Sequence, residues 1–123
     1  MENSKNSFDY LNNEISLLNS KIEKIKIFSE NELLIISVSL LLGQQRIIIS
    51  FEDVVEYGFY HNDKHIFYNV EDYKFKFIEE TQEFYISFDP YPGTEQIDNR
   101  DGDFIKSKRI KYTTATDKTE ILT

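Results

Sequence analysis

The first regular pattern in the chain is a stripe of apolar residues near the N-terminus. Its members are spaced three, four, three and four residues apart, which places them on one face of an α-helix. They are Phe8, Leu11, Ile15, Leu18 and Ile22. Ser4 or Ser7 is suited to cap this helix, and Asp9 lies in its first turn, where a carboxylate interacts favourably with the helix dipole. The pattern predicts an amphipathic helix over about residues 7–20.

Beyond this stripe, apolar and polar residues alternate with the period of two that is typical of strands. Ile25 and Ile27 alternate with lysines, and the clearest half-buried strand runs from Tyr73 to Phe77. Phe84, Ile86 and Phe88 repeat the pattern. Short polar turns separate these segments, which favours antiparallel neighbours, because parallel strands need long crossover connections.

These patterns predict a single α+β domain over residues 1–123. We expect the N-terminal amphipathic helix to pack on a curved, mostly antiparallel β-sheet of about six or seven strands. The strands are expected to form a meander over about residues 23–112. The polar tail 113–123 is expected to fray. Closure of the sheet into a barrel stays open.

The aromatic residues divide between a predicted core and a predicted opposite face. Phe75, Phe77, Phe84 and Phe88 occupy inward positions of their strands. Tyr60, Tyr68 and Tyr85 are predicted on the opposite face, and Tyr91 is predicted to be accessible in a loop. Tyrosine combines a large contact area with a hydrogen-bonding tip, which suits a protein-binding surface as well as a wet sheet.

Composition narrows the function classes. The chain has 123 residues, no cysteine and a net charge of -8. The acidic excess argues against a nucleic-acid binder, because neutralising phosphates requires a surplus of cations. The absence of cysteine excludes disulfides, thiolate zinc sites and cysteine nucleophiles.

The sequence predicts neither a secretory signal nor a membrane-spanning helix. No basic start followed by an apolar core is present at the N-terminus, so we expect no secretory signal. The most apolar stretch, Leu33–Leu42, has ten residues, whereas a membrane-spanning helix needs about 20. We predict a cytoplasmic protein without membrane contact.

Most of the negative charge lies in one quarter of the chain. The segment from Glu71 to Asp103 contains ten acidic and three basic residues, which gives it a net charge of -7. The short basic segment Lys106–Lys111 follows. Two interpretations fit this distribution: a solvated face that keeps the protein soluble, or a docking surface that attracts a basic protein partner.

A long loop lies within this acidic region. Pro90 and Pro92 end the preceding strand, and the next regular pattern begins near Phe104. Loops of about 15 residues are uncommon in compact domains and are often functional. We therefore place the candidate partner-binding surface on this loop and the acidic residues beside it. The candidates are Glu79, Glu80, Glu83, Tyr85, Asp89, Tyr91, Asp98, Asp101 and Asp103.

Two short motifs suggest metal sites but lack required ligands. Asp98–Asp103 resembles part of an EF-hand loop, but with Gly102 in the sixth position, Ile97 and Lys108 replace the carboxylates of the first and twelfth. His61 and His65 have the spacing of a helical zinc pair, but Asn62 replaces the glutamate of a zincin. We expect polar turns at both places, and neither a metal nor a cofactor.

Signatures of catalysis are missing from the sequence. It contains no G-x-S-x-G motif and no glycine-rich phosphate loop. The neighbouring carboxylates Glu52-Asp53 and Glu79-Glu80 would point to opposite faces of a strand, so they do not form an acid–base pair. We predict that the protein has no catalytic residues and is not an enzyme.

One part of the sequence resembles known proteins. The segment from Phe84 to Tyr91, together with Asp101 to Lys108, is similar to the C-terminal part of small bacterial proteins, some of them similar to immunity proteins of polymorphic-toxin systems. The resemblance covers about a quarter of the chain. It implies a stoichiometric, non-catalytic partner that blocks a cognate toxin, and it carries no residue-level role.

The leading hypothesis is a non-enzymatic acidic protein-binding domain, with an immunity protein as the specific case, whose region from Glu71 to Asp103 contacts a basic partner. The alternative is a small-ligand-binding or enzymatic domain with a cavity inside the curved sheet. A homo-oligomer that uses Leu33–Leu42 or a sheet edge also stays open.

Overall fold

The computed structural model describes residues 3–59 and 69–116. It has one helix followed by six strands: α1 (Ser4–Asn13), β1 (Lys21–Glu30), β2 (Leu33–Leu42), β3 (Gln45–Gly58), β4 (Lys74–Ile78), β5 (Glu83–Asp89) and β6 (Gly102–Thr116). The strands form a single sheet in which neighbours are antiparallel. The predicted α+β class and antiparallel sheet are confirmed.

The strand order is β1-β2-β3-β6-β5-β4. Two three-stranded meanders are therefore joined through the pairing of β3 with β6, and the prediction of one continuous meander is wrong. The joining pair extends from Gln45 opposite Thr116 to Gly58 opposite Phe104. Because Thr113–Thr116 pair with β3, the prediction that the chain frays from residue 113 is also wrong for these four residues.

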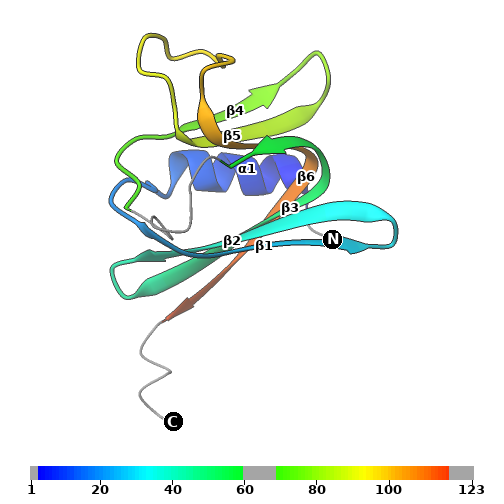
Figure 1. Ribbon diagram of the computed structural model, residues 1–123. Coiled ribbons are helices and arrows are strands. Elements are labelled where there is room, and N and C mark those ends of the chain that lie inside the picture. The colour runs from blue at the N-terminus through cyan, green and yellow to red at the C-terminus, as the bar shows by residue number, and fades with distance from the viewer. Residues whose placement is uncertain (1–2, 60–68, 117–123) are drawn as a thin grey trace.

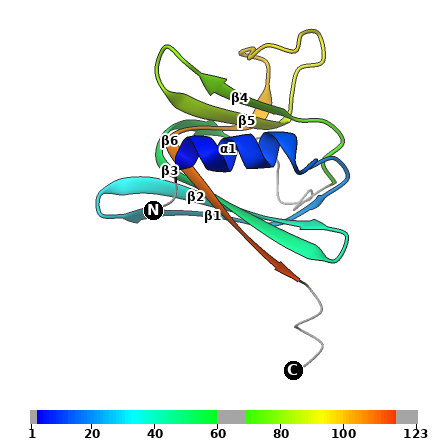
Figure 2. The ribbon, with the colours of Figure 1, turned by 180° about the vertical axis from the view of Figure 1, so that it is seen from behind.

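The sheet bends around the helix. In both views, α1 lies between the half of the sheet that contains β4 and β5 and the half that contains β1 and β2 (Figures 1 and 2). The long strands β3 and β6 run through both halves. A register shift between Val54 and Glu56 interrupts their pairing, and Asp53 next to it has a φ of 56°. Such bulges bend and twist a strand, which helps β3 pass from one half to the other.

The helix is shorter than predicted. It is capped by Asn3, whose side chain accepts hydrogen bonds from the backbone of Lys5 and Asn6, and it ends at Asn13 instead of near residue 20. Leu18 of the predicted stripe is 43% exposed, whereas Leu17 is fully buried. Asn12 and Asn13 are weak helix formers, so the helix ends there.

Tertiary hydrogen bonds hold the next segment, which turns at Leu18 and Asn19 before β1 begins. The backbone N–H of Leu17 donates to the Tyr73 hydroxyl, and that of Asn19 donates to the Val70 carbonyl. These contacts come from residues far along the chain, and they lead directly into β1. Ile22, which the spacing placed on the helix, is buried in this strand instead.

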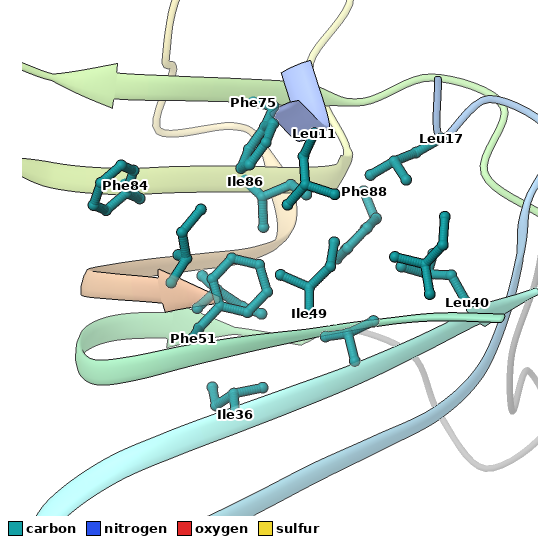
Figure 3. Packing of buried hydrophobic residues seen from close by; sticks show 14 of the residues in the cluster. Leu11, Leu17, Ile36, Leu40, Ile49, Phe51, Phe75, Phe84, Ile86 and Phe88 are labelled. Carbon is teal, nitrogen blue, oxygen red and sulfur yellow. The ribbon is translucent and has the colours of Figure 1, made fainter. Parts of the chain in front are cut away.

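The core fills the space between the two halves of the sheet. Leu11 projects from α1 between Phe75, Ile86 and Phe88 on one side and Ile49 and Phe51 on the other (Figure 3). The predicted core positions Phe75, Phe84 and Phe88 are buried, and Phe77 packs against the cluster while partly exposed. The concave side of the sheet is thus occupied by a helix and by packed apolar side chains.

Candidate binding surface

The long loop between β5 and β6 is organised by the buried carboxylate of Asp101. One of its oxygens, Oδ1, accepts hydrogen bonds from the Lys74 ammonium and from the Tyr91 backbone N–H, both at 2.8 Å. The other, Oδ2, accepts from the Tyr85 hydroxyl at 2.7 Å and from the Asp98 backbone N–H at 3.0 Å. One carboxylate therefore joins β4, β5 and both ends of the loop.

These contacts shift the pKa values of the buried groups. Burial alone would raise the pKa of Asp101, but the hydrogen bonds from Lys74, from the backbone and from Tyr85 outweigh burial and lower it. Burial raises the pKa of Tyr85 well above its usual value, and its hydrogen bond to Asp101 adds to this effect. Asp101 is therefore charged and Tyr85 neutral at physiological pH.

The loop covers the outer face of β5. Tyr85 lies on the face opposite Phe84 and Ile86, as the alternation predicts, yet only 3% of it is exposed. Its ring stacks on Phe104, with the ring centroids 5.9 Å apart. Its hydroxyl is held by Asp101, so Tyr85 supports the loop from below and is not part of the accessible surface.

The outer part of the loop is fixed by an exposed cation. The guanidinium carbon of Arg100 lies 3.7 Å from the ring centroid of Tyr91, and its Nε and Nη2 atoms donate to both carboxylate oxygens of Asp98. The hydrogen bonds from Arg100 lower the pKa of Asp98 to about 2. The Tyr91 ring also lies directly over Gly93, where an added side chain would displace the ring.

The structure separates the nine candidate residues into three groups. Glu83, Tyr85, Asp101 and Asp103 are buried. Tyr91 and Asp98 are half-buried and contact Arg100. Glu79, Glu80 and Asp89 are exposed. The candidates therefore do not form one surface.

Glu83 has a structural partner. Its carboxylate lies 3.2 Å from the Lys108 ammonium and accepts a hydrogen bond from the Thr81 hydroxyl. Burial acts to raise the pKa of Glu83, but these hydrogen bonds outweigh it and lower the pKa. This pairing joins the β4–β5 turn to β6.

The basic segment of β6 is paired mainly with acids of β3. Lys106 lies 3.6 Å from Glu56, and Lys111 lies 3.0 Å from Glu52. Arg109 contacts both Glu52 and Asp53. Because these strands are neighbours, their opposite charges meet across the sheet and largely neutralise one another.

A second set of carboxylates has no such partner among the residues that the structure describes. Glu71 and Asp72 precede β4, Asp89 ends β5 and Glu95 lies in the loop, and all four are exposed. Within residues 3–59 and 69–116, no ion pair joins these carboxylates to a cation. We call these four residues the acidic hairpin end.

Two clefts lie at the acidic hairpin end. One, of about 490 Å³, is lined by residues that include Asp72, Tyr91 and Glu95. The other, of about 610 Å³, is lined by residues that include Glu71, Asp72 and Asp89. Asp72 and Pro92 line both clefts, so the two clefts are connected. Lys74 and Lys76 also line the smaller cleft, whereas the described residues that line the larger one include three acids and no lysine or arginine.

Sequence reasoning missed three of these four residues. Glu71, Asp72 and Glu95 were counted in the acidic region but not among the candidate contacts. The register of the β4–β5 hairpin points to one of the three, because Lys74 is opposite Ser87 and the strands therefore bring Asp72 towards the candidate Asp89. Glu79 and Glu80 lie at the opposite end of this hairpin, roughly 20 Å away at about 3.3 Å per residue.

Several residues considered in the sequence lie in segments that the structure does not describe. Tyr60, Tyr68, His61 and His65 lie outside the described residues, as do residues 117–123. Among the residues described, no group of three or more histidines and carboxylates is arranged to hold a metal. In the same part of the chain, no helix has the length and apolar character needed to cross a membrane.

Comparisons with protein-family models, with curated proteins and with solved structures gave no match to this chain.

Proposed function

We propose that this protein is a non-enzymatic protein-binding domain that binds a basic protein partner through the acidic hairpin end. The observation that carries the proposal is the set of four exposed carboxylates beside two connected clefts, and none of these carboxylates forms an ion pair with a cation of residues 3–59 or 69–116. Such a surface attracts a positively charged protein during encounter and disfavours acidic partners.

The clefts suggest how the partner is held. A lysine or arginine side chain of the partner in the larger cleft would lie near Glu71, Asp72 and Asp89, which line that cleft. The Asp72 carboxylate is already oriented, since its Oδ1 accepts a hydrogen bond of 2.8 Å from the Tyr73 backbone N–H. Asp101 and Arg100 hold the loop that forms one wall, so binding would order little of the chain.

The resemblance of the segments around Phe84 and Asp101 to immunity-like proteins supports a specific form of this proposal. In that form, the partner is a cognate bacterial toxin, and the chain blocks it by stoichiometric binding. The immunity role and the basic partner are two separate proposals, because a basic partner of another kind would use the same surface.

The experiment is capture of a partner from a lysate of the native host by three matched proteins. Wild type and Glu79→Lys/Glu80→Lys are expected to capture the same basic protein, while Asp72→Lys/Asp89→Lys is expected to lose it. The two double variants change net charge equally and lie at opposite ends of one hairpin. Equal capture by all three would exclude the acidic hairpin end as the binding surface.

A further inference from the structure

Strand β1 has a long outer edge that the described residues leave largely unpaired. It is the first strand of the sheet and has ten residues. Within the part of the chain that the structure describes, its outer edge pairs only at Lys21, with Asn69. The rest of the edge presents backbone N–H and C=O groups that another strand can pair with.

Two apolar side chains at this edge are exposed on opposite faces of the sheet. Ile27 is 44% exposed and Phe28 is 38% exposed. Because successive residues of a strand point to opposite faces, a partner docked on one face would cover only one of them. A strand added at the edge places a neighbour beside both.

We propose that two copies of the chain pair antiparallel through β1 and form a two-fold dimer with a continuous twelve-stranded sheet. The proposal is independent of the proposed function. It rests on the register that the sequence of β1 allows when it pairs with itself.

Backbone geometry restricts this register. Every second residue of β1 directs its N–H and C=O towards β2, and the residues between them direct these groups to the free edge. Two identical edges can pair only when the edge-facing residues of one copy lie opposite edge-facing residues of the other. In such a pair, the two-fold axis passes between the two copies of a single residue. The register shift between Ile22 and Lys24 leaves residues 24–30 as the regular part of the strand, and its centre is Ile27.

The register centred on Ile27 is complementary in charge. It places Lys24 opposite Glu30 of the second copy, twice by symmetry. It also places Lys26 opposite Phe28, and Ile27 opposite its own symmetry mate. Within one chain, the Lys26 ammonium already lies 5.6 Å from the Phe28 ring centroid, so this cation suits an aromatic neighbour.

Neighbouring registers are less favourable. An axis at Lys26 places this lysine against its own copy, and an axis at Ile25 places Lys24 against Lys26. An axis at Phe28 also gives a complementary pair, Lys26 opposite Glu30, but it pairs only residues 26–30 and leaves Lys24 outside the paired segment. Lysines at a free edge ordinarily discourage pairing with another strand. Over residues 24–30, the register centred on Ile27 is the one that gives both Lys24 and Lys26 a favourable partner.

The register can be tested with single cysteines, because the chain contains none of its own. Ile27→Cys brings two cysteines opposite each other at the axis, with Cβ atoms about 4.5–5.5 Å apart, close to disulfide distance. Ser29→Cys is the matched control, since it lies on the same face and is also exposed. In the proposed register its two copies are about 13 Å apart.

We expect wild type to sediment as a dimer, and Ile27→Cys, but not Ser29→Cys, to form a disulfide-linked dimer on mild oxidation. Lys24→Glu should give a monomer, and Lys24→Glu/Glu30→Lys should restore the dimer. A monomeric wild type, or a dimer in which Ile27→Cys does not cross-link, would overturn the proposal. Equal cross-linking of both cysteine variants would likewise exclude this register.

Discussion

The ammonium of Lys74 lies 2.8 Å from the carboxylate of Asp101, and neither side chain is more than 6% exposed. The pair joins the edge strand β4 to the residue that precedes β6, and the same ammonium also donates to the Gln96 carbonyl. Because the Asp101 carboxylate holds Tyr85, Tyr91 and Asp98 as well, this ion pair fixes the loop that forms one wall of the clefts.

Removing one partner of this pair should destabilise the protein strongly. Lys74→Met leaves the Asp101 carboxylate buried without its cation, and loss of one member of a buried ion pair typically costs about 3–5 kcal/mol. Urea denaturation followed by circular dichroism measures the free energy of unfolding. Arg100→Ala is the control, because its pair with Asp98 is at the surface and its loss should lower the free energy of unfolding far less than Lys74→Met does. Equal losses in both variants would contradict the assigned role of Asp101.

Acid should destabilise the protein through Asp101. Its pKa in the folded state lies below the ordinary value of 3.8, because the hydrogen bonds from Lys74 and its other donors outweigh burial. As the pH falls, the unfolded chain therefore binds the proton first, and the stabilisation present above about pH 4 is lost below it. Asp101→Asn should be less stable at neutral pH and should show a shallower loss of stability in acid. Thermal melts between neutral pH and pH 3 measure both effects, and an unchanged acid slope would refute the assignment.

Alkali should destabilise the protein through Tyr85. Burial, followed by the hydrogen bond to Asp101, raises the folded-state pKa of Tyr85 above its ordinary value of 10.0. The unfolded chain therefore loses the proton first as the pH rises, and stability falls above about pH 10. Tyr85→Phe should lose about 1–3 kcal/mol at neutral pH, because Asp101 loses one donor. Its stability should then depend less on pH above 10 than that of wild type, which alkaline melts can compare directly.

The alternation of apolar residues predicted most of the strands, because each hairpin is a local structure whose register follows from its own sequence. The paired Phe75 and Ile86 are an example, since both face the core as predicted. The long pairing of β3 with β6 was not predictable in this way, because it joins residues far apart in sequence. The end of the helix was also missed: Asn12 and Asn13 disfavour a helix only weakly, and the contact that holds Leu17 outside it comes from Tyr73, which lies 56 positions later.

The candidate surface was predicted only in its general location. Charge counting found the acidic region, but it could not distinguish Asp101, which is buried and bonded to four donors, from Asp89, which is exposed. Burial of a carboxylate depends on partners such as Lys74 and Tyr85, and their positions follow from the sheet. The register of the predicted hairpin was the one signal in the sequence that could have shown that Asp72 and Asp89 lie near each other.

A turn residue offers a route to greater stability. Asn31 and Glu32 connect β1 to β2, and both have positive φ values, 53° and 68°. A glycine at the second position of such a turn relieves the strain of a side chain in the left-handed region, which costs about 1–2 kcal/mol. Glu32→Gly should therefore raise the melting temperature. Gly43→Ala, at a φ of 64° in the next hairpin, should lower it. A lower melting temperature for Glu32→Gly would contradict the assigned turn geometry.

The central claim is that the acidic hairpin end binds a basic protein. Its most direct test is the affinity of the captured partner for wild type, Asp72→Lys/Asp89→Lys and Glu79→Lys/Glu80→Lys at low and at physiological ionic strength. We predict that wild type and the Glu79/Glu80 variant bind alike, and that salt weakens both. We predict that the Asp72/Asp89 variant binds at least about tenfold more weakly, a difference of about 1.4 kcal/mol. An affinity that ignores both salt and the reversal of Asp72 and Asp89 would contradict the claim.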